Sequence, residues 1–378
     1  MKIADGGAAP GHRAPSEPDM PVEAPRMALV MIVRDEARCI QRCLDSVRPW
    51  VDEMLVLDTG SRDATVAIAQ RCGAVVKPFA WIDDFAAARN AALALTQAPW
   101  RLVLDADEWL VGGGDQLAAV RSQDPTFLGQ VRVASRIDHG ATDAPSWLPR
   151  LLPAGTRYAG RIHEQPESPL PRRRIALDIA HDGYLAAQRV GKAGRNRRLL
   201  ETALAEQPDD AYWNYQLGKD LEVNSQFVQA RPHYAHAYAS AAANASWRHD
   251  LVVRWMFTLK QLGCVDDALR VAAAEQARWA DSPDFHFTLG DVLLECAIRQ
   301  PQHAATLLPQ IEASWLRALQ LGERPDLPDS VQGRGSYLAA HNLAVFHASL
   351  GHVDTARHWE QRALRLRESA TAQPEVVG

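Results

Sequence analysis

The sequence predicts an α/β domain with a mostly parallel sheet, followed by an all-α domain of helical repeats. In the first half of the chain, short apolar runs alternate with segments of helical spacing, a pattern typical of parallel strands joined by helices. In the second half the strand signals end, and helical spacing continues with short breaks. The length of 378 residues also favours more than one domain.

Changes in composition predict where the domains begin and end. The proline-rich start and the last few residues lack periodicity and are expected to be disordered. The predicted parts are a tail at residues 1–26, the α/β domain at 27–186, the repeat domain at 187–370 and a second tail at 371–378.

Composition and charge narrow the function classes. The chain is 47% hydrophobic and 23% charged, which is ordinary for a soluble globular protein. A formal net charge of −5 gives no electrostatic case for nucleic-acid binding. No apolar run is long enough to cross a membrane and no secretory signal precedes the first domain, so the sequence predicts no transmembrane segment and a cytoplasmic location.

Strands and helices of the first domain follow from local patterns. Four apolar runs that end in polar residues predict strands at residues 28–33, 54–57, 74–76 and 100–104. Helical spacing predicts a helix after each of the first three strands. Weaker signals predict further strands at residues 130–134, 150–152 and 175–177, and a loop at residues 112–114.

The helical half resembles degenerate tetratricopeptide repeats. Small residues such as Gly218 and Gly290 stand where helices are expected to cross, with large apolar residues between them. The spacing does not keep a strict period, so a plain helical bundle is the alternative interpretation.

Carboxylates follow the fourth predicted strand in the run Asp105-Ala106-Asp107-Glu108. Like charges crowded at the end of a buried strand are costly unless a cation compensates them. Mg²⁺ and Mn²⁺ prefer hard oxygen ligands, commonly one or two carboxylates together with substrate phosphates. We therefore expect a metal–diphosphate site at this sheet edge, with a solvated acidic turn as the alternative.

Eight short motifs follow one another along the first half of the chain, at residues 31–36, 43–47, 51–53, 57–65, 83–91, 104–108, 160–165 and 181–184. Together, and in this order, they resemble the family 2 glycosyltransferases. The resemblance covers about residues 28–184 well and the repeats loosely, and it extends to a bacterial subgroup that includes lipopolysaccharide-core and bacteriocin peptide S-glycosyltransferases.

This resemblance implies a GT-A fold, a nucleotide-sugar donor (UDP-sugar foremost), a divalent metal (Mn²⁺ or Mg²⁺) and transfer with inversion. The repeats favour a peptide or protein acceptor, because stacked hairpins form an extended concave surface. A lipopolysaccharide-core or other glycolipid acceptor is the alternative, and a non-catalytic scaffold with a silenced transferase domain is the second. The repeats are also a candidate homodimer interface.

Residues on the donor side receive roles on this basis. We expect Asp107 to bind the metal directly, and Asp105 to contact the ribose hydroxyls or a metal-bound water. The planar fork of Arg89 suits a diphosphate, with a surface ion pair to Asp83 or Asp84 as the alternative. Asn90 is a candidate for the donor sugar or phosphate, with a helix-surface position as its alternative.

Residues near the ends of the predicted strands are candidates for the nucleotide base and ribose. A carboxylate suits the imide N–H of uracil, and the resemblance points to Asp84 at the base edge. Asp58 has turn capping as its alternative. The full set is Val33, Arg34, Glu36, Asp58 and Asp84.

The pair His163-Glu164 is the expected acceptor side of the site. Glu164 is the candidate base for the acceptor proton, and His163 the candidate metal or phosphate contact. Neighbours in an extended chain point to opposite faces, so both reach one site only where the backbone bends. A pair that caps a loop is the alternative. His181 is expected to be a packed core histidine.

Overall fold

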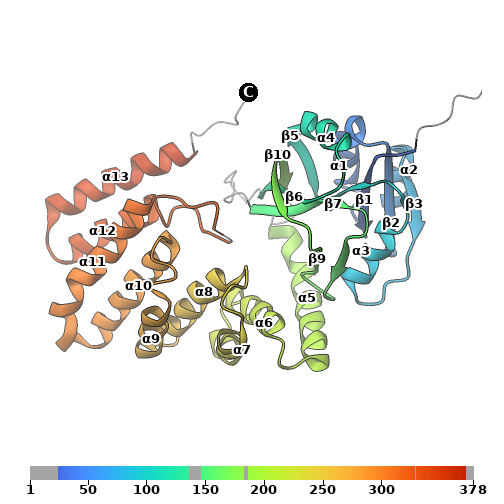
Figure 1. Ribbon diagram of the computed structural model, residues 1–378. Coiled ribbons are helices and arrows are strands. Elements are labelled where there is room, and N and C mark those ends of the chain that lie inside the picture. The colour runs from blue at the N-terminus through green and yellow to red at the C-terminus, as the bar shows by residue number, and fades with distance from the viewer. Residues whose placement is uncertain (1–23, 136–145, 183–185, 328, 372–378) are drawn as a thin grey trace, which may run out of the picture.

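The computed structural model describes residues 24–135, 146–182, 186–327 and 329–371, and it divides into an α/β domain and a curved array of helices (Figure 1). The predicted tails lie almost entirely outside these residues. No helix in the described ranges has the length and apolar character needed to cross a membrane.

A sheet of eight strands forms the first domain, in the order β3-β2-β1-β4-β7-β6-β10-β5. The strands β1 to β4 pair in parallel, which places their carboxyl ends at one edge. The strands are β1 (Met27–Val33), β2 (Glu53–Asp58), β3 (Val75–Pro78), β4 (Trp100–Val103), β5 (Glu108–Gly112), β6 (Leu128–Ser135), β7 (Ser146–Pro153) and β10 (Arg172–His181). The strands expected from the apolar runs are confirmed.

Helices cover both faces of the sheet because successive side chains of a strand point to opposite sides. In β1, Leu29 and Met31 are buried in one cluster with α1 (Ile40–Val47), α2 (Thr65–Arg71) and α4 (Gly114–Arg121). Ala28 and Val30 of the same strand are buried in a second cluster with α3 (Phe85–Leu93). The parallel sheet with helices on both sides therefore agrees with the sequence.

In the first domain, three strands and one helix were missed by the sequence reasoning: β5, the two short strands of a hairpin, and α4. The acidic run continues directly into β5, which pairs antiparallel with β10 at the edge of the sheet. The expected loop at residues 112–114 is a single sharp turn at Gly113, with φ of +77°, and α4 starts at the next residue. Non-local pairing with β10 makes this strand, and local hydrophobic periodicity does not report such pairing.

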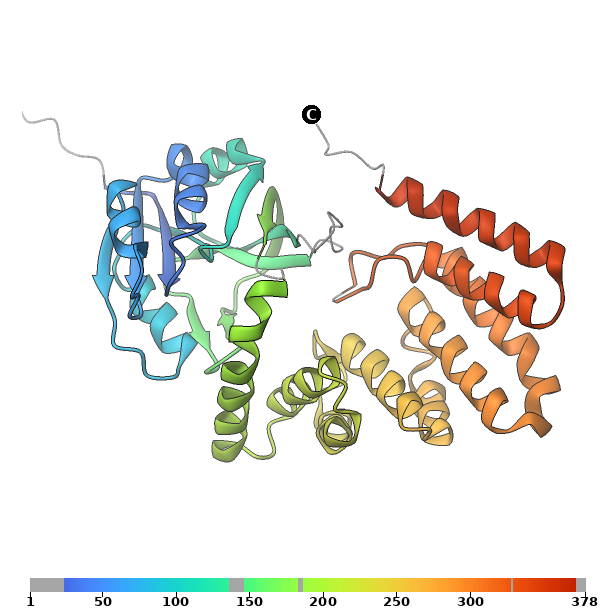
Figure 2. The same cartoon turned by 180° about the vertical axis from the view of Figure 1, so that it is seen from behind.

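A small hairpin of the first domain packs against the helical domain. Its strands are β8 (Arg157–Ala159) and β9 (Gln165–Glu167), and the turn between them carries Ile162, which is buried in the core of the helical domain. Behind the hairpin, the ring of Trp213 lies so close to Gly160 that a Cβ there would meet it at 2.6 Å. Figure 2 shows the hairpin beside the first repeat helices from the opposite side.

The remaining helices form antiparallel pairs that follow one another along an arc (Figure 1). They are α5 (Ala186–Glu206), α6 (Ala211–Val223), α7 (Phe227–Ser240), α8 (Arg248–Gln261), α9 (Val265–Glu275), α10 (Pro283–Arg299), α11 (Ala304–Leu321), α12 (Tyr337–Ser349) and α13 (Val353–Thr371). Gly218 and Gly290 lie where paired helices meet, against the rings of Tyr234 and Trp315. The expected small residues at helix crossings are confirmed, and the array has the form of helical repeats.

We predict that Gly290→Ala lowers the thermal unfolding midpoint of the full chain. A Cβ at this position would lie 2.5 Å from Nε1 of the buried Trp315 ring. Such overpacking costs about 1–3 kcal/mol, which outweighs the roughly 1 kcal/mol gained in helix propensity. The matched control is Gly194→Ala on α5, where a Cβ would meet nothing within 4 Å and the midpoint should rise. An equal rise in both variants would contradict the close packing at Gly290.

Candidate active site

Polar side chains gather at the carboxyl ends of β1, β2 and β4, where ligands bind on open α/β sheets. Asp105 and Asp107 follow β4 directly, and Glu108 opens β5. Asp107 and Glu108 are buried and Asp105 is partly exposed. Three carboxylates in so little space require compensating positive charge.

Arg89 supplies part of this charge from α3. Its Nη2 donates to Oδ1 of Asp105 at 2.8 Å, and its Nε is paired with Oε1 of Glu164. The side chain is only 9% exposed, so the alternative of a surface ion pair is wrong. The acids proposed for that pair are engaged elsewhere, because Asp83 pairs with Arg198 and Asp84 caps the start of α3.

Arg150 supplies the remaining positive charge beside these carboxylates, and the sequence reasoning did not recognise it. It points from β7 toward the same carboxylates, with Nη2 at 3.1 Å from Oδ2 of Asp105 and paired with Oε1 of Glu108. The signal was an arginine inside an otherwise apolar strand, which is rare without a buried partner. The result is a row of alternating charges, from Glu164 through Arg89, Asp105 and Arg150 to Glu108.

Within the row, the pKa values of Asp105 and Glu108 are shifted in opposite directions. Burial alone would raise the pKa of Asp105, but Arg89 and Arg150 outweigh burial and hold this pKa well below its usual range. Burial dominates at Glu108 and raises its pKa, although Arg150 acts in the lowering direction. Asp105 is therefore firmly ionised at neutral pH.

Two nitrogen atoms of the row remain without a hydrogen-bond partner within the described part of the chain. They are Nη1 of Arg89 and Nε of Arg150, and both are buried. A buried donor that lacks a partner costs about 1–3 kcal/mol, so such an atom suggests a missing acceptor. The Arg89 atom lies on the guanidinium that already contacts both Asp105 and Glu164.

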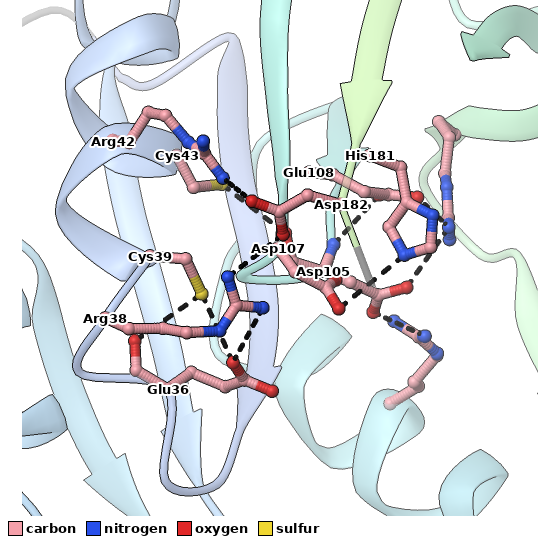
Figure 3. A network of polar contacts seen from close by, with 12 residues as sticks. Glu36, Arg38, Cys39, Arg42, Cys43, Asp105, Asp107, Glu108, His181 and Asp182 are labelled. Carbon is pink, nitrogen blue, oxygen red and sulfur yellow. Dashed lines mark hydrogen bonds and ion pairs between the residues drawn. The ribbon is translucent and has the colours of Figure 1, made fainter. Parts of the chain in front are cut away.

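His181, at the end of β10, is the imidazole beside Asp107 (Figure 3). Its Nε2 lies 3.6 Å from Oδ2 of Asp107. Burial lowers the pKa of His181, but Asp107, Glu108 and Asp105 outweigh burial, so the pKa is raised. His181 is partly exposed and pairs with Asp107, so the expectation of a packed core histidine is wrong, while the metal or phosphate role of His163 stays a prediction.

His163 lies on the turn of the β8–β9 hairpin and is exposed. Its φ of +51° supplies the backbone bend that the pair His163-Glu164 required, and Glu164 faces Arg89. The carbonyl oxygen of His163 accepts a hydrogen bond from the Tyr212 hydroxyl, at 3.2 Å. No group of three or more His, Cys, Asp or Glu side chains among the described residues is arranged to hold a metal ion.

A second set of charges borders the site. Asp182 pairs with Arg38, at 3.1 Å, and with Arg42 (Figure 3). Arg42 lies on α1, and Arg38 lies in the turn just before it. The guanidinium of Arg42 lies 3.5 Å from the ring centroid of Trp109, a cation–π contact. Trp109 is buried beneath it, so this ring closes the core under the acidic turn.

The nucleotide candidates on β1 and β2 lie at the expected edge. Arg34 is exposed, the backbone N–H of Glu36 donates to Thr65, and the carbonyl of Val33 accepts from Thr59. Asp58 accepts hydrogen bonds from the N–H groups of the turn that follows β2, which is its turn-capping alternative. The nucleotide contacts of these residues stay predictions.

Asn90 has a structural role. Its side-chain amide donates to the carbonyl of Tyr158 at 2.9 Å and accepts from the Tyr158 N–H at 2.8 Å, so it ties α3 to β8. The sequence reasoning expected a contact of this amide with a donor sugar or phosphate, or a position on the helix surface. Neither expectation included the pairing with the Tyr158 backbone.

We predict that Arg150→Met lowers the free energy of unfolding more at about pH 7.5 than at about pH 4. The folded state raises the pKa of Glu108, so the stability that this acid contributes is fully present below its unfolded pKa of roughly 4.3 and is lost as pH rises through the folded pKa. Removing Arg150 raises that pKa further, and a buried carboxylate left without its partner costs on the order of 3 kcal/mol. Urea unfolding at both pH values measures the difference.

Glu108→Gln in the Arg150→Met background should recover most of the loss at neutral pH, because no buried charge remains at that position. A loss that is the same at both pH values, and that this second change does not reduce, would show that Arg150 contributes by packing alone.

Comparisons with known proteins agree with this architecture. A sequence model described as glycosyl transferase family 2 matches residues 28–133. A TPR repeat-containing protein of Synechococcus elongatus is 36% identical over 268 residues, which covers 66% of each chain. The SPbeta prophage-derived glycosyltransferase SunS of Bacillus subtilis is 28% identical over 213 residues, covering 53% of this chain and 50% of that protein.

An uncharacterized glycosyltransferase of Rickettsia felis is 39% identical over 87 residues, which covers 22% of this chain and 30% of that protein. The matches with the cyanobacterial protein and with SunS span between half and two thirds of those relatives. The matched family segment contains β1 to β5 and the turn between β4 and β5 that carries Asp105 and Asp107. The N-terminal domain of this chain therefore belongs to glycosyl transferase family 2, and it is fused to a domain of helical repeats.

Proposed function

We propose that the chain is a metal-dependent glycosyltransferase, which moves a sugar from a UDP-sugar to a peptide or protein acceptor with inversion at the anomeric carbon. The observation that carries the proposal is the pair of aspartates at the end of β4 in a family 2 domain, with two buried arginines beside them. The related SunS is named as a glycosyltransferase, which supports the same reaction class.

The donor side of the proposal rests on Arg89. A leaving diphosphate gains negative charge in the transition state, and a fixed guanidinium in a buried position stabilises such charge strongly. Nη1 of Arg89 is a buried donor still available to an anion within the described residues. Asp105 accepts a hydrogen bond from this guanidinium and holds it in place. Because Asp105 remains partly exposed, its carboxylate can also accept hydrogen bonds from the ribose hydroxyls.

The residues present fit a divalent metal brought in with the diphosphate. Asp107 and His181 would hold it, and both carboxylate and imidazole are common metal ligands. Sites of this kind need one or two protein carboxylates, because phosphate oxygens and water complete the coordination. When bound, the ion would neutralise charge on the leaving diphosphate.

Glu164 is the proposed base. As the acceptor atom bonds to the anomeric carbon and the bond to the diphosphate oxygen breaks, the acceptor proton passes to the Glu164 carboxylate. Arg89 contacts both this carboxylate and Asp105, so one side chain connects the acceptor and donor sides. His163 stays a candidate phosphate contact from the hairpin turn.

A glycolipid acceptor is the second candidate, and the helical repeats favour a polypeptide over it. The intact set of Asp105, Asp107, Arg89 and Glu164 argues against a silenced scaffold. The homodimer and the cytoplasmic location stay predictions from the sequence.

We predict that UDP binds the full chain in the presence of Mn²⁺ and that EDTA abolishes this binding, as measured by isothermal titration calorimetry. Asp107→Asn should reduce the hydrolysis of UDP-sugars, followed by mass spectrometry across a donor panel, by about 100-fold or more while the protein stays folded. Asp45→Asn on the exposed face of α1 is the matched control. Near-normal hydrolysis in Asp107→Asn would remove the metal role from Asp107.

Glu164→Gln should lower the transfer rate at saturating donor by about 100-fold or more, because the amide cannot take the acceptor proton. UDP affinity should change little, since Asp105 continues to hold Arg89. Steady-state kinetics with the acceptor and calorimetry with UDP separate the two effects. Transfer at the normal rate would show that another group accepts the proton.

A further inference from the structure

A cleft of about 540 Å³ lies between the β8–β9 hairpin and the first repeat helices. One wall consists of hairpin residues that include Gln165 and Glu167. The other wall comes from the end of α5 and the start of α6, with Gln207, Asp210 and Tyr212. Figures 1 and 2 show these elements side by side at the junction of the two domains.

The charge of the cleft is strongly negative. Its lining contains four carboxylates, Asp84, Glu167, Glu206 and Asp210, against one guanidinium, Arg161. Arg161 is already paired with Glu206 at 2.7 Å, so its charge is compensated inside the wall. Glu167 is exposed and makes no ion pair with any residue in the described ranges.

The cleft adjoins the proposed base along the chain. Gln165 follows Glu164 directly and lines the cleft, while Glu164 itself faces Arg89. Across the cleft, the Tyr212 hydroxyl donates to the carbonyl of His163, at 3.2 Å. Glu164 does not itself line the cleft, but Gly160 does, and a Cβ on Gly160 would lie 3.6 Å from the Cα of Glu164. A molecule held in the cleft therefore lies close to the backbone of the proposed base.

We propose that this cleft binds a lysine- or arginine-containing segment of a polypeptide acceptor, which places the acceptor atom near Glu164. The inference rests on the proposed function and names its acceptor class. The volume suits a short extended segment, and the amides of Gln165 and Gln207 can pair with its backbone. Asp84 and Asp210 cap helices and Glu206 is paired. The Glu167 carboxylate and the ring of Tyr212 are therefore the groups best placed to attract cationic side chains. The same charges repel a phosphate-bearing glycolipid.

The experiment measures peptide binding to the full chain by fluorescence anisotropy, without donor. The probes are a labelled peptide of alternating lysine and serine and a matched peptide of alternating glutamate and serine. We expect only the lysine peptide to bind, and added salt to weaken it because its partners are exposed charges. Glu167→Lys should weaken it about tenfold, since one attraction becomes a repulsion.

Glu360→Lys on α13 is the matched control, with the same change of net charge on an exposed position far from the cleft. Equal weakening in both variants, equal binding of both peptides, or no binding of the lysine peptide would overturn the inference. Donor hydrolysis is measured separately on the same proteins. Its absence would count against the proposed function, while peptide selectivity alone tests the cleft.

Discussion

The alternating row of charges at the sheet edge is the interaction on which the site depends. Five ionisable side chains from four separate segments meet there, and all except Asp105 have little access to water. They are Glu164, Arg89, Asp105, Arg150 and Glu108. Each would be costly to bury alone, and each is acceptable beside its neighbours. Because Arg89 touches both Asp105 and Glu164, a shift of either carboxylate alters the surroundings of the other.

Local patterns were sufficient for most of the α/β domain. Buried parallel strands such as β1 and β4 are continuous apolar runs, and the carboxylates after β4 stand out against them. Helical spacing likewise predicted α1 and α3, and small residues among large apolar ones predicted the helix crossings at Gly218 and Gly290, where the structure places a large ring against each glycine. These features depend on residues close together in the sequence.

Features that arise from distant segments were missed. Arg150 and His181 are isolated residues in sequence, and only the pairing of β7 with β4 and of β10 with β5 brings them to Asp105 and Asp107. Nothing local ranks His163 and His181, since both follow weak strand signals, and only the structure shows that His181 is the one beside Asp107. Asn90 illustrates the same point, because its amide is committed to a backbone 68 positions away.

The turn of the β8–β9 hairpin has its hydrophobic anchor in the other domain, since Ile162 is buried among repeat residues such as Leu199 and Trp213. The change from strands to helices along the chain therefore does not mark where one hydrophobic core ends and the next begins, because the core of the helical domain includes Ile162. If the two domains were exchanged between proteins during evolution, the hairpin would have to be transferred together with the repeats against which it packs. A chimera joined after β10 with foreign repeats would leave Ile162 in mismatched packing and Glu164 poorly placed.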